Sequence, residues 1–88
     1  MALNVTFFNH LCLFDQMDII HRHGEYITTI KECKNIINLH LVDDAFVEVY
    51  YHEKYAKVRF VRVIHLNDKR FDLYSDQVNL EDLYTAKT

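Results

Sequence analysis

A chain of 88 residues has room for one domain with a modest core, because a protein of this size buries only about 60–65% of the surface that its unfolded form exposes. Half of the residues are hydrophobic, six Phe and six Tyr among them, which excludes an intrinsically disordered chain. The formal net charge is −3, and no basic stripe stands out, so we expect no nucleic acid partner.

The most apolar stretch, LNVTFFNHLCLF, lies near the N-terminus and is interrupted by Asn4, Asn9 and His10. It is shorter than the roughly 18 uncharged apolar residues that suggest a membrane helix, and no basic region precedes it. The sequence therefore predicts no signal peptide and no membrane partner. We expect a cytoplasmic protein whose Cys12 and Cys33 stay reduced.

The first predicted element is a helix. Leu13, Met17 and Ile20 are three and four residues apart and would share one face. Asn9 is a suitable N-cap, so the helix is expected to begin there. Residues 1–8 would be either a frayed lead-in or a short extra strand.

This helix is expected to end at residues 21–24, HRHG, because basic side chains suit the last turn and a following Gly commonly adopts a left-handed conformation. From there on, apolar residues alternate with a period of two. Four strands are predicted, at residues 26–31, 37–41, 46–52 and 57–64. Short polar breaks between them indicate tight connections and therefore an antiparallel meander.

The second hairpin of this meander has two possible registers. A two-residue turn at residues 43–44 would place Glu48 opposite Leu39, on an apolar face. A three-residue loop at residues 43–45 keeps the apolar residues together and places His40 opposite Glu48 on the other face. Because a slip of one residue moves every side chain to the opposite face, the sequence favours the three-residue loop.

In this register both faces of the sheet are rich in apolar side chains. The core face, expected to lie under the first helix, carries Ile37, Leu39, Leu41, Val47, Val49, Tyr51, Val58 and Phe60. The second face carries Ile27, Ile36, Phe46, Tyr50, Val61 and Val63 around Asn38, His40 and Glu48. Large apolar groups are seldom left open to water in such numbers, so either the C-terminal helix or another protein is expected to cover the second face.

The C-terminal helix is predicted from Asn67 as its cap, from the spacing of Phe71 and Tyr74, and from Leu66, which could pack on Phe71 as a hydrophobic staple. The alternative is a fifth strand at FDLY. The sequence thus predicts a single α+β domain over residues 1–88, in which a four-stranded antiparallel meander is flanked by an N-terminal helix and a C-terminal helix.

The order FNHLCLFDQMDIIHRHGEYI, LVDDAFVEVYYH and DQVNLEDLY resembles small bacterial proteins of the Bacteroidetes type, which have a helix, a four-stranded meander and a C-terminal helix. The resemblance covers most of the chain. Its motifs are structural, namely the Gly after the first helix and the strand VEVYY. It implies the same fold and a bacterial origin, and it carries over no activity.

Six histidines raise the question of a metal site or an acid–base site. The only cluster that the register suggests is His40, Glu48 and His52, which could form a small-ligand site or a metal-assisted hydrolytic site. A glutamate that accepts a histidine N–H orients the imidazole, as in hydrolytic triads. No nucleophile, phosphate loop or zinc motif accompanies the cluster, so we predict no catalytic residue, no metal and no cofactor. A cross-strand ion pair of His40 with Glu48 is the simpler interpretation.

The second sheet face suggests a function in protein binding, because partly polar surfaces that are rich in Tyr and poor in Lys suit protein contacts. The sequence predicts a protein-interaction module, acting as a homodimer, an adaptor or an inhibitor. Its apolar anchors would be Phe46, Tyr50, Val61 and Val63, and its polar contacts would be His40, Glu48 and Arg59.

Overall fold

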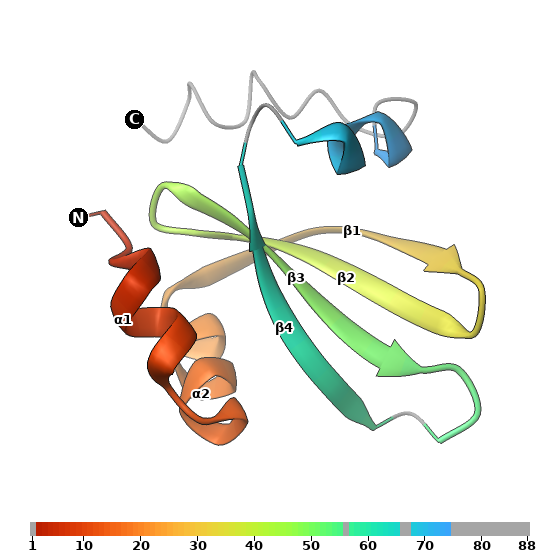
Figure 1. The fold of residues 1–88 in the computed structure, drawn as a ribbon, viewed down its shortest axis with the longest axis horizontal. Helices are drawn as coiled ribbons and strands as arrows, with labels where there is room; N and C mark the ends of the chain where they lie inside the picture. The colour runs from red at the N-terminus through yellow and green to blue at the C-terminus, as the bar shows by residue number, and fades with distance from the viewer. Residues whose placement is uncertain (1, 56, 66–67, 75–88) are drawn as a thin grey trace.

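The computed structural model describes residues 2–55, 57–65 and 68–74 (Figure 1). Its elements are α1 (Val5–His10), α2 (Leu13–His23), β1 (Gly24–Glu32), β2 (Asn35–Val42), β3 (Ala45–His52), β4 (Val58–Ile64) and the 3-10 helix η1 (Lys69–Leu73). The four strands form one antiparallel sheet in the order β1-β2-β3-β4. The predicted α+β fold with a four-stranded meander is therefore confirmed.

The N-terminal region forms two helices where one was predicted. The side chain of Asn4 accepts a hydrogen bond from the backbone N–H of Phe7 and so caps α1. The backbone is extended at Leu11, which separates α1 from α2. The predicted start at Asn9 is thus wrong, and so is the lead-in or extra strand at residues 1–8, because Asn4 provides an earlier cap.

Gly24 ends α2 as predicted, but its conformation differs from the prediction. Its φ of −90° and ψ of 155° are extended, so the chain passes directly from α2 into β1 without a left-handed residue. A Cβ atom at this position would collide with the backbone carbonyl oxygen of Ile20. Glycine is therefore required here by a close approach of two backbone segments.

The turn between β2 and β3 has two residues, so the predicted three-residue loop is wrong. Leu39 pairs with Glu48. His40 pairs with Val47 on the opposite face of the sheet. Asp43 adopts a φ of 55° in this turn, a left-handed conformation that aspartate tolerates better than most residues.

This register divides the apolar residues of the sheet between two cores. The core beside η1 consists of Leu39, Leu41, Phe46, Ile64 and Tyr74. The core beside the N-terminal helices consists of Phe8, Ile20, Val42, Val47 and Val49. The helices and η1 lie on opposite sides of the sheet (Figure 1), so the sheet is the middle layer. The prediction that one core face under the first helix carries both the β2 leucines and the β3 valines is wrong. The observed register places Leu39 and Leu41 beside η1, whereas Val47 and Val49 lie beside the N-terminal helices.

Residues after β4 were predicted to form a helix capped by Asn67. In the described residues Asp68 is the cap, and its side chain accepts a hydrogen bond from the backbone N–H of Arg70. A short 3-10 helix follows at Lys69–Leu73, so FDLY is not a fifth strand. The predicted staple of Leu66 and the helix beyond Tyr74 lie outside the described residues.

Because the sheet is a meander, its turns lie at two ends. The β1–β2 and β3–β4 turns share one end, and the backbone N–H of Glu53 donates to the carbonyl of Lys34 to join them. We call this the hairpin end and define it as residues 31–35, 52–55 and 57–59. The β2–β3 turn lies at the opposite end of the sheet (Figure 1).

Candidate functional site

The structure distributes the seven predicted contact residues over both faces and one end of the sheet. Phe46, Glu48 and Tyr50 lie on the face beside η1, His40, Val61 and Val63 lie on the face beside α1 and α2, and Arg59 lies at the hairpin end. Phe46 and Tyr50 are only 1% and 3% exposed. The prediction that these residues form one open surface is wrong, because the register differs and because residues 70–74 cover Phe46 and Tyr50.

Glu48 is fully buried and accepts three hydrogen bonds. Arg70 Nε donates to its Oε1 at 2.7 Å, and the Tyr50 hydroxyl donates to the same oxygen at 3.0 Å. The Tyr74 hydroxyl donates to Oε2 at 2.6 Å. We call Glu48, Tyr50, Arg70 and Tyr74 the Glu48 cluster. Its donors explain why a carboxylate can lie on an apolar face, since a buried charge needs partners.

The electrostatics of the Glu48 cluster hold each proton in place at neutral pH. Burial and the charge of Glu48 raise the pKa of Tyr50 to about 12. Burial, followed by the hydrogen bond to Glu48, raises the pKa of Tyr74 as well. Burial would lower the pKa of Arg70, but the hydrogen bond and the charge of Glu48 outweigh it and raise that pKa. None of these shifts brings a pKa toward 7, so the arrangement suits the fastening of residues 70–74 to the sheet rather than acid–base catalysis.

His40 lies on the opposite face of the sheet from the Glu48 cluster. Its ring packs against that of Tyr26 in a T-shaped arrangement, with ring centroids 5.8 Å apart, on the face beside α2. Burial, and then the nearby charge of His21, lowers the pKa of His40. His40 therefore does not pair with Glu48, and the predicted ion pair is wrong.

The alternative hydrolytic site also lacks its geometry. His40 and Glu48 lie on opposite faces, and His52 is four residues from Glu48 along β3, or roughly 13 Å at the rise of an extended strand. Within residues 2–55, 57–65 and 68–74, no three His, Cys, Asp or Glu side chains are arranged to hold a metal ion. The three predicted residues thus form no common site.

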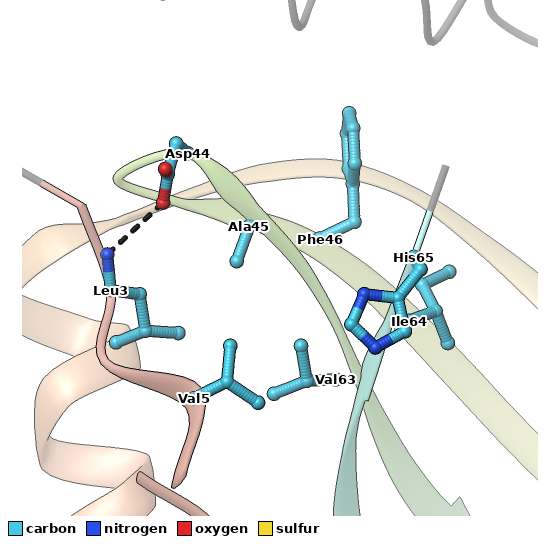
Figure 2. Close-up of a pocket in the computed structure, with 8 residues that line it drawn as sticks. All are labelled: Leu3, Val5, Asp44, Ala45, Phe46, Val63, Ile64 and His65. Carbon is cyan, nitrogen blue, oxygen red and sulfur yellow. Dashed lines mark hydrogen bonds between the residues drawn. The ribbon is translucent and has the colours of Figure 1, made fainter. Parts of the chain in front are cut away.

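A hollow of about 320 Å³ lies between the N-terminal segment and the β3–β4 strands. It is lined by Leu3, Val5, Asp44, Ala45, Phe46, Val63, Ile64 and His65. Figure 2 shows the side chains of Val5, Ala45 and Val63 pointing toward one another across an apolar floor. The Asp44 carboxylate accepts a hydrogen bond from the backbone N–H of Leu3 at 3.0 Å. This carboxylate therefore holds the N-terminal segment against the sheet, and the hollow is best explained as part of the fold.

A wider hollow of about 640 Å³ lies at the hairpin end. It is lined by His52, Tyr55, Lys57, Val58 and Arg59. Tyr55 is 67% exposed, and its ring lies against that of His52 with centroids 4.8 Å apart. The ammonium of Lys54 lies 5.6 Å from the centroid of the Tyr55 ring. We call this feature the Tyr55 hollow.

The polar groups of the Tyr55 hollow are mainly donors. His52 Nδ1 accepts a hydrogen bond from the backbone N–H of Lys54, so in the neutral imidazole Nε2 carries the proton and can donate. Arg59 uses one N–H to bond Asn35 Oδ1 at 2.8 Å, which leaves the other guanidinium donors for a ligand. No carboxylate is among the residues that line the hollow. The hollow is suited to anionic groups.

Charge is distributed unevenly between the two ends of the sheet. The hairpin end carries five cations, Lys31, Lys34, Lys54, Lys57 and Arg59. Its two carboxylates are paired, Glu53 with Lys31 and Glu32 with Arg70. A chain with a net charge of −3 therefore has one positive end. This end is not evident in the sequence because its cations lie in two separate turns, although the predicted meander brings these turns to the same end of the sheet.

Comparisons with models of protein families, with curated proteins and with solved structures find no match. The resemblance to small bacterial proteins of the Bacteroidetes type therefore stays a prediction. Among the described residues, no helix is both long enough and apolar enough to cross a membrane.

Proposed function

We propose that the protein is a protein-interaction module that binds an acidic surface of its partner through the hairpin end. The observation that carries this proposal is the Tyr55 hollow, where an exposed aromatic ring lies beside the donors of His52, Lys57 and Arg59; the neighbouring carboxylate of Glu53 is paired with Lys31. Tyr and Arg contribute strongly to binding at protein interfaces, and complementary charge directs the encounter of two proteins.

Other surfaces of the sheet are less suited to this task. One face is covered by η1 and the other by α1 and α2 (Figure 1). Both edge strands are irregular. The pairing of β1 with β2 shifts register between Tyr26 and Thr28, and the pairing of β4 with β3 shifts register opposite Tyr50 and Tyr51. Bulges of this kind discourage the addition of a further strand. The hairpin end remains as the surface with an organised set of donors.

The chemistry of the proposed contact follows from its side chains. A carboxylate of the partner would accept hydrogen bonds from the guanidinium of Arg59 and from Nε2–H of His52, and the ammonium of Lys57 would add charge. The ring of Tyr55 would pack against the aliphatic part of the same side chain. Because these groups are exposed, added salt should weaken the binding strongly.

We also propose a bacterial protein that acts in the cytoplasm. The observation that supports a reducing compartment is that Cys12 and Cys33, which are the two cysteines of the chain, are both free and exposed.

Fluorescence anisotropy with a fluorescein-labelled oligoglutamate peptide tests the proposed binding. At low ionic strength the peptide should bind, and added salt should weaken this binding. The variants Arg59→Gln and Tyr55→Ala should each weaken binding at least about fivefold, because each loses a contact of about 1 kcal/mol.

Two variants on α2 are matched controls. Arg22→Gln removes the charge of an arginine whose side chain is 71% exposed. Phe14→Ala removes the aromatic ring of a residue that is 80% exposed. Both should leave the affinity unchanged. Equal losses in the controls and in the hairpin variants would refute the proposed surface. Preferential binding of a single-stranded oligonucleotide over oligoglutamate would refute a protein partner.

A further inference from the structure

The two ends of the sheet have opposite charge. The end that contains the β2–β3 turn carries the carboxylates of Glu25, Asp43 and Asp44, and strand and turn residues 24–26, 42–46 and 63–65 include no Lys or Arg. The last turn of α2 also reaches this end and is basic, although its Arg22 is paired with Asp18. The hairpin end lies at the other end of strands that are about eight residues, or roughly 25 Å, long. The strand and turn residues at the two ends of the sheet thus differ in charge.

The β2–β3 turn lies beside the N-terminal segment and is partly exposed. It consists of two residues between two paired strands, and Figure 1 shows it away from the other turns. Asp44 is bound to the backbone N–H of Leu3. The carboxylate of Asp43 contacts no cation in the part of the chain that the structure describes, and its residue is partly exposed. Asp43 is therefore available to a partner.

We propose that a second copy of this chain is a partner of the hairpin end, and that the Asp43–Asp44 turn of one copy docks in the Tyr55 hollow of the next. This inference rests on the proposed function, because it uses the same hollow. The turn supplies the carboxylate of Asp43, and the hollow supplies His52, Lys57 and Arg59 as donors. The two surfaces are complementary in charge, and both are present on every copy.

The charges of the two ends favour a contact between unlike ends. A two-fold contact that joins equal ends would bring like charges together, which is unfavourable. A head-to-tail contact joins unlike ends and leaves one free end on each side, so it can extend into short chains. The surfaces are small and exposed, so the association should be weak and sensitive to salt.

Sedimentation velocity over a range of protein concentrations tests this arrangement. At low ionic strength the average mass should rise above the 10.6 kDa of one chain, and added salt should reverse the rise. The variants Asp43→Asn and Lys57→Glu should each weaken the association at least about fivefold. Asparagine tolerates the left-handed conformation of residue 43, so the first variant keeps the turn. Asp15→Asn on α2 and Lys69→Glu on η1 are matched controls and should associate like the original chain.

An equimolar mixture of the two variants gives the sharpest result. Asp43→Asn retains the hairpin end and Lys57→Glu retains the turn, so one intact contact can form between them. The mixture should reach about twice the mass of one chain and go no further. A mixture no heavier than its components, or full association of Asp43→Asn alone, would overturn the head-to-tail contact.

The same preparations separate this inference from the proposed function. If the original chain and Asp43→Asn bind oligoglutamate but neither associates with itself, the second copy is overturned as the partner and the hairpin end is retained as a binding surface. If no preparation binds the peptide, both proposals are overturned.

Discussion

Replacing Glu48 with glutamine should destabilise the fold severely, although it changes the size of the side chain very little. The carboxylate accepts hydrogen bonds from Tyr50, Arg70 and Tyr74, at 3.0, 2.7 and 2.6 Å. Glutamine has one acceptor oxygen, and its NH2 group would stand where glutamate has a second acceptor oxygen. This NH2 group would face a hydrogen-bond donor, which would then have no acceptor. The guanidinium of Arg70, whose side chain is 17% exposed, would also lose its closest counter-charge.

The size of the effect follows from the burial of the pair. Removal of one partner from a buried ion pair costs about 3–5 kcal/mol. Arg70 keeps a longer contact of 3.4 Å with Glu32, which places the cost near the lower limit, at about 3 kcal/mol. Small domains have free energies of unfolding of about 5–15 kcal/mol, so this loss is a large share of the total.

Urea denaturation followed by far-ultraviolet circular dichroism measures this loss. With an m-value of about 1 kcal/mol/M, the midpoint of Glu48→Gln should fall by about 3 M. The double variant Glu48→Leu with Arg70→Met should be more stable than Glu48→Gln, because it leaves no buried charge unpaired. Asp15→Asn, an exposed control, should lie within about 0.5 kcal/mol of the original chain. If Glu48→Gln is as stable as this control, the Glu48 cluster does not fasten residues 70–74.

Three further predictions follow from other parts of the structure. The pKa of Tyr50 is raised from 10.0 to about 12, so the contribution of Tyr50 to stability is complete below pH 10 and is lost as the pH rises toward 12. Tyr50→Phe should therefore make the fall in unfolding free energy at alkaline pH less steep. Burial and the charge of His21 lower the pKa of His40 from 6.5, so the contribution of His40 to stability is present above pH 6.5 and is lost as the pH falls. His21→Gln should raise the pKa of His40 in an NMR titration, and an unchanged value would contradict the charge interaction between the two histidines. Gly24→Ala should cost about 1–3 kcal/mol, because its Cβ would meet the carbonyl oxygen of Ile20, and a thermal melt equal to that of the original chain would contradict this close approach.

The strands were predictable because their evidence is local. Apolar alternation and the polar breaks at residues 32–35, 43–44 and 53–54 place all four strands within about two residues of their observed bounds. The end of α2 at Gly24 was predictable for the same reason. The start of the first helix was not, since Asn4 and Asn9 are both suitable caps and the sequence does not show that Leu11 is extended.

The register could not be predicted from local evidence. A buried carboxylate opposite Leu39 is unfavourable unless it has partners, and the partners of Glu48 are Arg70 and Tyr74, which lie 22 and 26 residues further along the chain. The apolar pattern alone therefore favours the three-residue loop. That register places His40 on the same face as Glu48, so the predicted contact surface is wrong as well.

The hairpin end was predictable in principle. Lys34 and Lys54 lie in the first and third turns of a meander, and such turns always share one end of the sheet. What the sequence does not show is the hollow beside Tyr55, because it depends on how His52 and Arg59 are placed around that ring.

The most direct test of the proposed binding surface is a titration of the ¹⁵N-labelled protein with the oligoglutamate peptide, followed by ¹H–¹⁵N correlation spectra. The largest shifts should come from the hairpin end, with Tyr55 and Arg59 among them, and they should shrink as salt is added. If the largest shifts instead come from Phe46 and Tyr50, or from α1 and α2, or if the peptide causes no shifts, the hairpin end is not the surface through which this protein binds.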